Sequence, residues 1–227
     1  MAFPTILLNF SGIYLEEEFH PEAAVLLDFH ELEGTECYCD KPAEAFIREA
    51  LRPWPAEALH WIDGGDYHYA SLFWMEKIRE PFDLFLLDHH SDDQEPAFGD
   101  GILSCGGWVA TARRQLPLLR DTVWIQDGPA DVSSGLPVYL SIDKDVLSPD
   151  FARTNWDQGS LTLAGLKEIL RAVASRRRIL GIDVCGGLSL SKGACGKDVE
   201  INRRTDEELQ AFLVSFLYKS VFPDSQK

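Results

Sequence analysis

Six short apolar segments, each ending in an aspartate and most followed by a stretch with helical character, constrain the fold of this chain most strongly. Their nearly continuous apolarity is typical of strands that are buried on both faces of a parallel sheet. The predicted strands are residues 24–28, 59–63, 82–88, 123–127, 138–143 and 178–183. The predicted helices are about 42–51, 69–80, 107–120, 162–176 and 205–219. This alternation predicts an α/β fold, a three-layer sandwich with a mostly parallel central sheet.

The helix ends carry recognisable signals. We expect Thr162 or Ser160 to cap the fourth helix, and Thr205 to cap the last, with Glu208 at the capping-box position. No repeat, low-complexity tract or linker interrupts the 227 residues. The sequence therefore predicts one domain over 1–227, with a frayed tail from about residue 222.

Charge and composition exclude several classes of protein. The formal net charge of −16 argues against general binding to nucleic acid or anionic lipid. No apolar run approaches the roughly 20 residues of a membrane helix, and no basic stretch precedes the apolar N-terminal segment, so we expect a cytoplasmic protein. The five dispersed cysteines are interpreted as reduced thiols (Cys37, Cys39, Cys105, Cys185 and Cys195).

The aspartates at the strand ends suggest a site. In open α/β sheets the ligand lies beyond the carboxyl ends of the strands, so this fold gathers many carboxylates at one edge. Crowded carboxylates repel one another and resist burial unless a cation compensates them. For Asp28, Asp63, Asp127 and Asp183, a strand terminator or helix cap is an equally good interpretation.

Two clusters point more specifically to a metal. Asp88, His90 and Asp92 stand at alternate positions after one predicted strand, and Asp143 and Asp145 do so after another. Oxygen donors combined with imidazole suit Mn²⁺ or a related divalent ion. Carboxylates can also bridge two ions, and two ions sharing a water lower its pKa enough to supply hydroxide near neutral pH.

The same residues resemble the signatures of a known family. Asp88–Asp92 resembles the Asp-x-His-x-Asp signature of the arginase/agmatinase (ureohydrolase) family. Ser141–Pro149 resembles its Ser-x-Asp-x-Asp-x-x-Asp-Pro signature, with Ser148 at the place of the last aspartate. Gly64–His68 resembles its Gly-Gly-Asp-His-Ser, with the histidine displaced by one residue. The three motifs occur in family order over about residues 59–190.

The resemblance implies an arginase-like fold and a pair of divalent ions, most simply Mn²⁺, whose bridging hydroxide attacks a guanidinium or amide carbon. By position, one ion is expected on His68, Asp88, Asp92 and Asp143. The second is expected on Asp88, His90, Asp143 and Asp145. Asp88 and Asp143 then bridge, and Asp92 and Asp145 are also expected to act in catalysis. His89 has no counterpart among the ligands and is expected to line the pocket.

Departures from the family leave the substrate open. Cys105 stands roughly where the family has a proton-shuttle histidine, and either a catalytic role or an inert buried thiol fits. No glutamate follows the strand at 178–183 to pair with a guanidinium, although Asp183 or a residue of another loop could substitute. The loops at 33–40 and 156–159 could each border the active site or only pack on the core. The short chain suggests an open, acidic mouth that admits a bulky cationic substrate, such as an arginine within a peptide, and the family suggests a homo-oligomer.

Three other classes deserve comparison. A single-zinc deacetylase of related fold would use Asp88, His90 and a late aspartate, but the additional ligands favour two metals. A phosphoryl-transfer enzyme is disfavoured because the sequence lacks a Gly-x-x-x-x-Gly-Lys-Ser/Thr loop. A non-catalytic metal-binding descendant of the fold stays open.

Overall fold

The centre of the protein is a parallel sheet of seven strands in the order β2-β1-β4-β9-β8-β5-β7. The computed structural model describes residues 4–95, 102–128, 133 and 135–221. In chain order the strands of the sheet are β1 (Thr5–Asn9), β2 (Val25–Asp28), β4 (Leu59–Gly64), β5 (Phe82–Leu87), β7 (Leu119–Ile125), β8 (Val138–Asp143) and β9 (Ile179–Gly187). Five of them (β1, β4, β5, β8 and β9) are buried along their whole length, which explains their largely apolar character.

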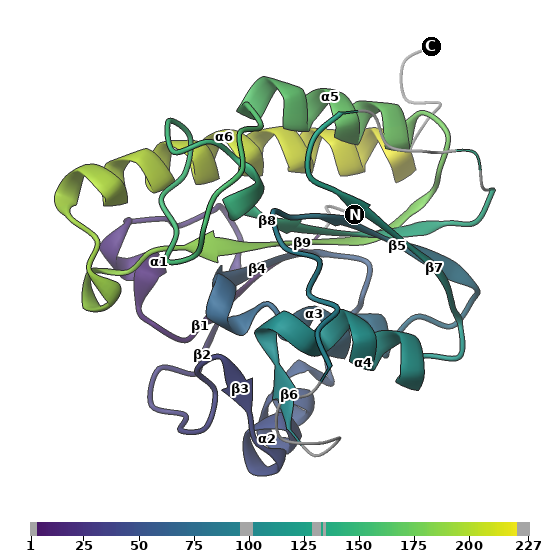
Figure 1. Cartoon of the computed structure of the whole chain (residues 1–227), viewed down its shortest axis with the longest axis horizontal. Helices are drawn as coiled ribbons and strands as arrows, with labels where there is room; N and C mark the ends of the chain where they lie inside the picture. Colours follow the sequence, from purple (N-terminus) through teal and green to yellow (C-terminus); the bar gives the residue numbers. More distant parts are fainter. Residues whose placement is uncertain (1–3, 96–101, 129–132, 134, 222–227) are drawn as a thin grey trace.

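Helices cover both faces of the sheet (Figure 1). On one face lie α2 (Lys41–Leu51), α3 (Ala70–Met75) and α4 (Trp108–Gln115). On the other lie α5 (Leu163–Ala174) and α6 (Gly196–Val221), and the short α1 (Ile13–Glu16) follows β1. Each face has its own apolar core, one around residues such as Ile47 and Phe73 and one around Leu166 and Leu213. The predicted α/β three-layer sandwich is therefore confirmed.

Short elements shape the loops beyond the carboxyl ends of the strands. Two residues each from β3 (Tyr38–Cys39) and β6 (Leu103–Ser104) pair antiparallel. Single 3₁₀ turns follow four elements: η1 (Gly65–Tyr67), η2 (Cys105–Gly107), η3 (Lys144–Val146) and η4 (Leu190–Lys192). Of these turns, η1 and η3 come directly after β4 and β8, where they adjoin or contain the predicted ligands His68 and Asp145.

All predicted strands and helices are present, but several boundaries were wrong. No strand was predicted at β1, which is nevertheless an internal, fully buried strand between β2 and β4. The helix predicted at 107–120 ends at Gln115 because Leu116 precedes a proline and is extended, and β7 begins at Leu119. The helix predicted at 69–80 ends at Met75.

The last helix was also predicted too short. Thr162 caps α5 as expected, since its side chain accepts a hydrogen bond from the Gly165 amide. Thr205, however, is not a cap, because α6 begins at Gly196 and Thr205 lies inside it, donating to the Phe151 carbonyl. Near the true start, Asp198 accepts a hydrogen bond from the Cys195 amide.

The tail predicted to fray from about 222 lies outside the described residues. Among the helices of the described part of the chain, none has the length and apolar character needed to cross a membrane.

Candidate metal centre

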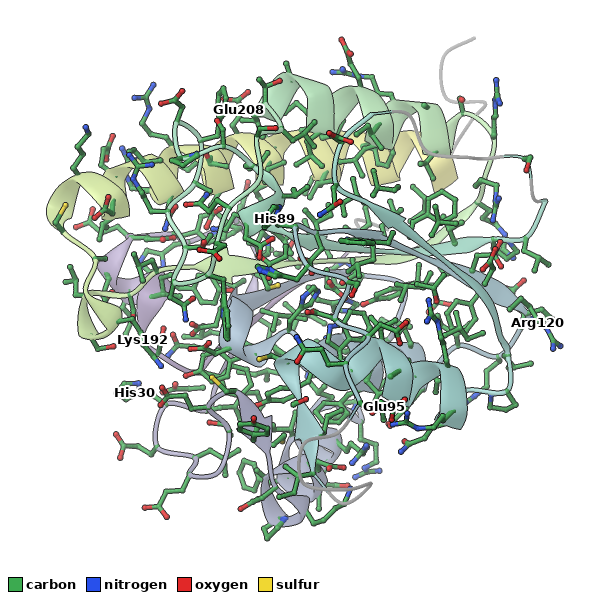
Figure 2. The ribbon with its side chains drawn as sticks, viewed as in Figure 1. His30, His89, Glu95, Arg120, Lys192 and Glu208 are labelled. Carbon is green, nitrogen blue, oxygen red and sulfur yellow. The ribbon has the colours of Figure 1, made fainter. Side chains whose placement is uncertain are left out.

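Four neighbouring strands bring the predicted ligands to one edge of the sheet. Strands β4, β9, β8 and β5 lie side by side in this order, and the loops that follow them carry the acidic and imidazole groups. Figure 2 shows this region near the centre of the view, where His89 labels the loop after β5. Parallel strands place their carboxyl ends together, so residues far apart in the sequence meet here.

His68 is surrounded by three carboxylates. Its Nδ1 atom lies 3.0 Å from Asp92 Oδ2, 3.3 Å from Asp88 Oδ2 and 3.5 Å from Asp143 Oδ2. The displaced histidine reaches this position because Gly65–Tyr67 form a 3₁₀ turn and His68 stands at its C-terminal end. The tight turn thus accommodates the one-residue displacement.

His90 lies on the other side of Asp88. Its Nδ1 atom is 2.7 Å from Asp145 Oδ2 and 3.8 Å from Asp88 Oδ1. Backbone amides hold the same carboxylates, since His90 N donates to Asp88 Oδ1 and His89 N donates to Asp145 Oδ1. Asp88 therefore faces both histidines, one with each oxygen. The loop is not extended throughout as expected, because Asp92 has a φ of 49°.

Within the described residues, three groups can hold a metal ion. They are His68 with Asp88 and Asp92, Asp88 with His90 and Asp145, and His68 with Asp143 and Cys185, each with its ligand atoms within 4.8 Å of one another. All six predicted ligands occur in these groups. The third group adds a cysteine that the sequence reasoning did not assign.

Two orphaned atoms test whether an ion fits. His68 Nδ1 and Asp88 Oδ2 are fully buried, and neither has a hydrogen-bond partner. His68 Nδ1 is close to its three carboxylate oxygens, but no hydrogen bond of acceptable angle forms. A buried polar atom without a partner is costly, commonly about 1 to 3 kcal/mol. Converging donors that do not bond to one another fit the coordination of a cation, so the residues present fit a divalent ion.

The electrostatics of the cluster agree with this. Burial raises the pKa of Asp88 well above its usual value, and the charges of Asp143 and Asp92 raise it further. Burial and the charge of Asp145 raise the pKa of Asp143 to about 7. Without an ion, both carboxyl groups therefore lose their protons at a higher pH than an ordinary aspartate does. A divalent cation removes that penalty.

Neighbouring side chains orient the His68 imidazole and the Asp92 carboxylate. His68 Nε2 lies 2.8 Å from Ser141 Oγ, and Ser141 Oγ donates to Asp183 Oδ1 at 2.6 Å. Trp108 Nε1 donates to Asp92 Oδ2 at 2.7 Å. Such contacts fix ring and carboxylate orientation around metals. Sequence reasoning assigned no role to Ser141 beyond its motif or to Trp108.

A cavity of about 260 Å³ opens above these groups. Its floor contains Asp88, Asp92, Asp143, Asp145 and His90. Its walls are Cys37, Tyr38, Gly65, Gln94, Ser104, Cys105, Gly106 and Trp156. Both loops of uncertain role, 33–40 and 156–159, therefore border the site.

Cys105 lines the cavity, as its position in the sequence predicted. Burial raises the pKa of the Cys105 thiol far above its usual value, and the charge of Cys37 contributes. Near neutral pH this thiol keeps its proton, and it is therefore both a weak acid and a poor nucleophile.

Asp66 was missed as a positioning residue. It is buried, and its Oδ1 accepts hydrogen bonds from Asn155 Nδ2 and Trp156 Nε1, both at 3.0 Å, and from Cys37 Sγ at 3.3 Å. Lys192 Nζ lies 3.1 Å from its other oxygen. Asp66 thus fixes the aromatic wall of the cavity. The signal was available, because Asp66 belongs to the Gly64–His68 motif.

The place where the family carries its guanidinium-binding glutamate has no acidic side chain at the cavity. Asp183 cannot substitute, because it is fully buried and faces Ser141 instead. Gly186 has a φ of 88°, and a Cβ there would lie 2.1 Å from Asp143 Oδ1. This glycine is required for the close approach of β9 to Asp143.

The remaining strand-end aspartates, Asp28, Asp63 and Asp127, do not belong to the metal-holding groups of the described residues. Asp63 accepts hydrogen bonds from the Phe10 and Ser11 amides and from the Ser11 hydroxyl. Asp28 accepts from Asn9 Nδ2. Asp127 is exposed. For these three, the interpretation as strand terminators fits better.

Comparison with known proteins defines first a class and then a family. The structure is similar to proclavaminate amidino hydrolase from Streptomyces clavuligerus, with a TM-score of 0.65 and 18% identity over 96% of this chain and 92% of that one. It is also similar to a T. brucei arginase-like protein, a triple mutant bound with Mn²⁺, with a TM-score of 0.57 and 16% identity over 96% and 91% of the two chains. Arginase, agmatinase and formimidoylglutamase structures share the same fold. The chain therefore has the fold of the ureohydrolases, which confirms that resemblance at the level of the fold.

At the level of sequence, the chain is 31% identical over 196 residues to an uncharacterised protein of Thermotoga maritima, covering 79% of this chain and 78% of that protein. The chain belongs to the same protein family as this Thermotoga protein. No protein-family model matches the sequence.

Proposed function

We propose that this protein is a metal-dependent hydrolase of non-peptide C–N bonds in cationic substrates, with two divalent ions, most simply Mn²⁺, at the carboxyl end of its sheet. The observation that carries the proposal is the pair of buried, unpartnered donors, His68 Nδ1 and Asp88 Oδ2, within a cluster of four aspartates and two histidines. The fold shared with amidino-cleaving hydrolases supports the reaction class.

Two neighbouring groups of donors support a pair of ions. His68, Asp92 and Asp143 would hold one, His90 and Asp145 would hold the other, and Asp88 would serve both because its two oxygens face opposite sides. Bound divalent ions would lower the pKa of a coordinated water and supply a nucleophile near neutral pH.

The residues around the ions would bind and orient the substrate. The acidic floor attracts a cationic group, and Trp156, fixed by Asp66, offers an aromatic face beside it. Cys105 lines the cavity as a neutral thiol and would donate a hydrogen bond to the substrate, because its raised pKa makes it too weak an acid for proton transfer near neutral pH.

The walls favour a substrate other than free arginine. Neither Gly186 nor the buried Asp183 offers a carboxylate to a guanidinium, so the cation must be bound by the floor and the aromatic wall. We propose a guanidinium within a larger, peptidic substrate, because the exposed aromatic side chains of Tyr38 and Trp156 beside the cavity offer contacts that free arginine would not fill.

The test is to incubate the Mn²⁺-loaded protein with arginine-containing peptides, free arginine and agmatine, and to measure the urea released from each. We expect turnover of the peptides at least ten times faster than that of free arginine, and its loss in Asp143→Asn. A fully metal-loaded protein that releases no urea from any of these would contradict the proposal.

A further inference from the structure

Cys185 lies inside the metal centre rather than beside it. It is the partner of Asp143 in the register between β8 and β9, and its side chain is fully buried. Its Sγ atom donates a hydrogen bond to Asp143 Oδ2 at 3.1 Å. This is the same oxygen that lies 3.5 Å from His68 Nδ1.

The sulfur and the orphaned imidazole nitrogen therefore flank one carboxylate oxygen. The ligand atoms of His68, Asp143 and Cys185 all lie within 4.8 Å of one another. Donors that share one divalent ion are about 3 to 4 Å apart, because each lies about 2.0 to 2.3 Å from it. The separation between Cys185 Sγ and Asp143 Oδ2 falls in this range, and His68 Nδ1 is buried without a hydrogen-bond partner.

We propose that Cys185 is a sulfur ligand of the ion on the His68 side, which makes this half of the centre a mixed nitrogen, oxygen and sulfur site. The inference rests on the proposed metal centre and goes beyond it. As the ion binds, the S–H bond breaks, the sulfur keeps the electron pair and the proton leaves to solvent. A thiolate donor favours Zn²⁺ or Co²⁺ over Mn²⁺. The two halves of the centre would then differ in metal preference.

The other thiols near the site have different surroundings. Cys105 and Cys37 line the cavity, and the Cys37 thiol donates to Asp66. Neither belongs to a metal-holding group among the described residues. Cys105 is the matched control, because it is a buried thiol bordering the same cavity.

The experiment is metal spectroscopy on the full chain loaded with Co²⁺ or Zn²⁺. We expect the Co²⁺ protein to show a near-ultraviolet sulfur-to-cobalt charge-transfer band. The band should persist in Cys105→Ser and be lost in Cys185→Ser. Serine at position 185 keeps a hydrogen-bond donor to Asp143. X-ray absorption of the Zn²⁺ protein should show a sulfur scatterer at about 2.3 Å. The affinity ratio of Zn²⁺ to Mn²⁺ should fall at least tenfold in Cys185→Ser.

The results separate this inference from the proposed function. Full metal content with only nitrogen and oxygen scatterers, or a band that survives in Cys185→Ser, would overturn the sulfur ligand and leave the metal hydrolase intact. Absence of any bound ion in the wild-type protein would overturn both. If Cys185→Ser does not fold, the scatterer in the wild-type protein decides the question by itself.

Discussion

His68 Nδ1 and Asp88 Oδ2 lie 3.3 Å apart, fully buried, and neither has a hydrogen-bond partner. The two residues come from loops after different strands, β4 and β5, which are not neighbours in the sheet. The fold brings the two atoms together without a hydrogen bond between them. A shared cation accounts for this arrangement.

Metal affinity should fall as the pH decreases below about 7. Protons and the ion compete for the same oxygens, and burial together with Asp145 raises the pKa of Asp143 to about 7. Each proton that must be displaced weakens binding about tenfold per pH unit. Calorimetric titration with Mn²⁺ from pH 5.5 to 8 measures this slope. An affinity that does not change over this range would contradict a role for Asp143 as a ligand.

Replacing Ser141 with alanine should weaken metal binding about 10- to 100-fold, because Ser141 links the His68 imidazole to Asp183. Ser71→Ala is the matched control, since Ser71 is also a buried serine, and its hydroxyl lies 3.4 Å from that of Ser141. We expect Mn²⁺ affinity within about threefold of wild type in this control. Equal losses in the two variants would indicate a general packing effect.

Replacing Gly186 with alanine should lower the free energy of unfolding much more than replacing Gly193 does. Both glycines have positive φ, 88° and 98°, but a Cβ at Gly186 would meet Asp143 Oδ1 while nothing lies within 4 Å at Gly193. We expect Gly193→Ala to lower the free energy of unfolding by about 1 kcal/mol and Gly186→Ala by about 2 to 4 kcal/mol. Urea unfolding of the metal-free proteins measures both. Gly186→Ala should also weaken metal binding, and unaltered binding would show that β9 can move away from Asp143.

A buried histidine outside the site should make the fold sensitive to acid. Burial lowers the pKa of His60 to about 3, whereas an unfolded histidine titrates near 6.5. The stabilising contribution is complete above about pH 6.5, and it decreases by up to about 1.4 kcal/mol per unit as the pH falls towards 3, because only the unfolded chain takes up the proton.

His60→Gln removes this titration while offering polar groups to Tyr139 and the Pro55 carbonyl, the partners of His60. In urea unfolding of metal-free protein, the stability difference between wild type and His60→Gln should therefore narrow from pH 6.5 to 4.5. A stability difference that is constant with pH would contradict this prediction, because it would mean that His60 takes up a proton as readily in the folded state as in the unfolded state.

Much of this site could be predicted from the sequence because its signals are local. Apolar runs ending at Asp88 and Asp143 predicted strands, and parallel strands must bring their carboxyl ends together. The alternate spacing of the donors then indicated a metal. The displaced His68 needed a tight turn at Gly65–Tyr67, which the glycines permit but do not specify.

The features that could not be predicted from the sequence depend on tertiary contacts. The sequence identified Cys185 only as one of five dispersed thiols, because only the pairing of β8 with β9 places it beside Asp143. Asp183 and Asp63 looked like Asp88 in the sequence, yet their partners, Ser141 and Ser11, come from distant segments. Strand β1 was missed because an apolar segment at a chain end gives no sign of whether it pairs inside a sheet.

The most direct test of the metal centre is the number of Mn²⁺ ions bound per chain after equilibrium dialysis, compared between wild type, Asp88→Asn and Asp93→Asn. Asp88 faces both donor groups, whereas Asp93 is at the surface and pairs with Arg113. We predict close to two ions in the wild type, close to two in Asp93→Asn, and fewer than one in Asp88→Asn. No bound ion in the wild type, or an unchanged count in Asp88→Asn, would contradict the account.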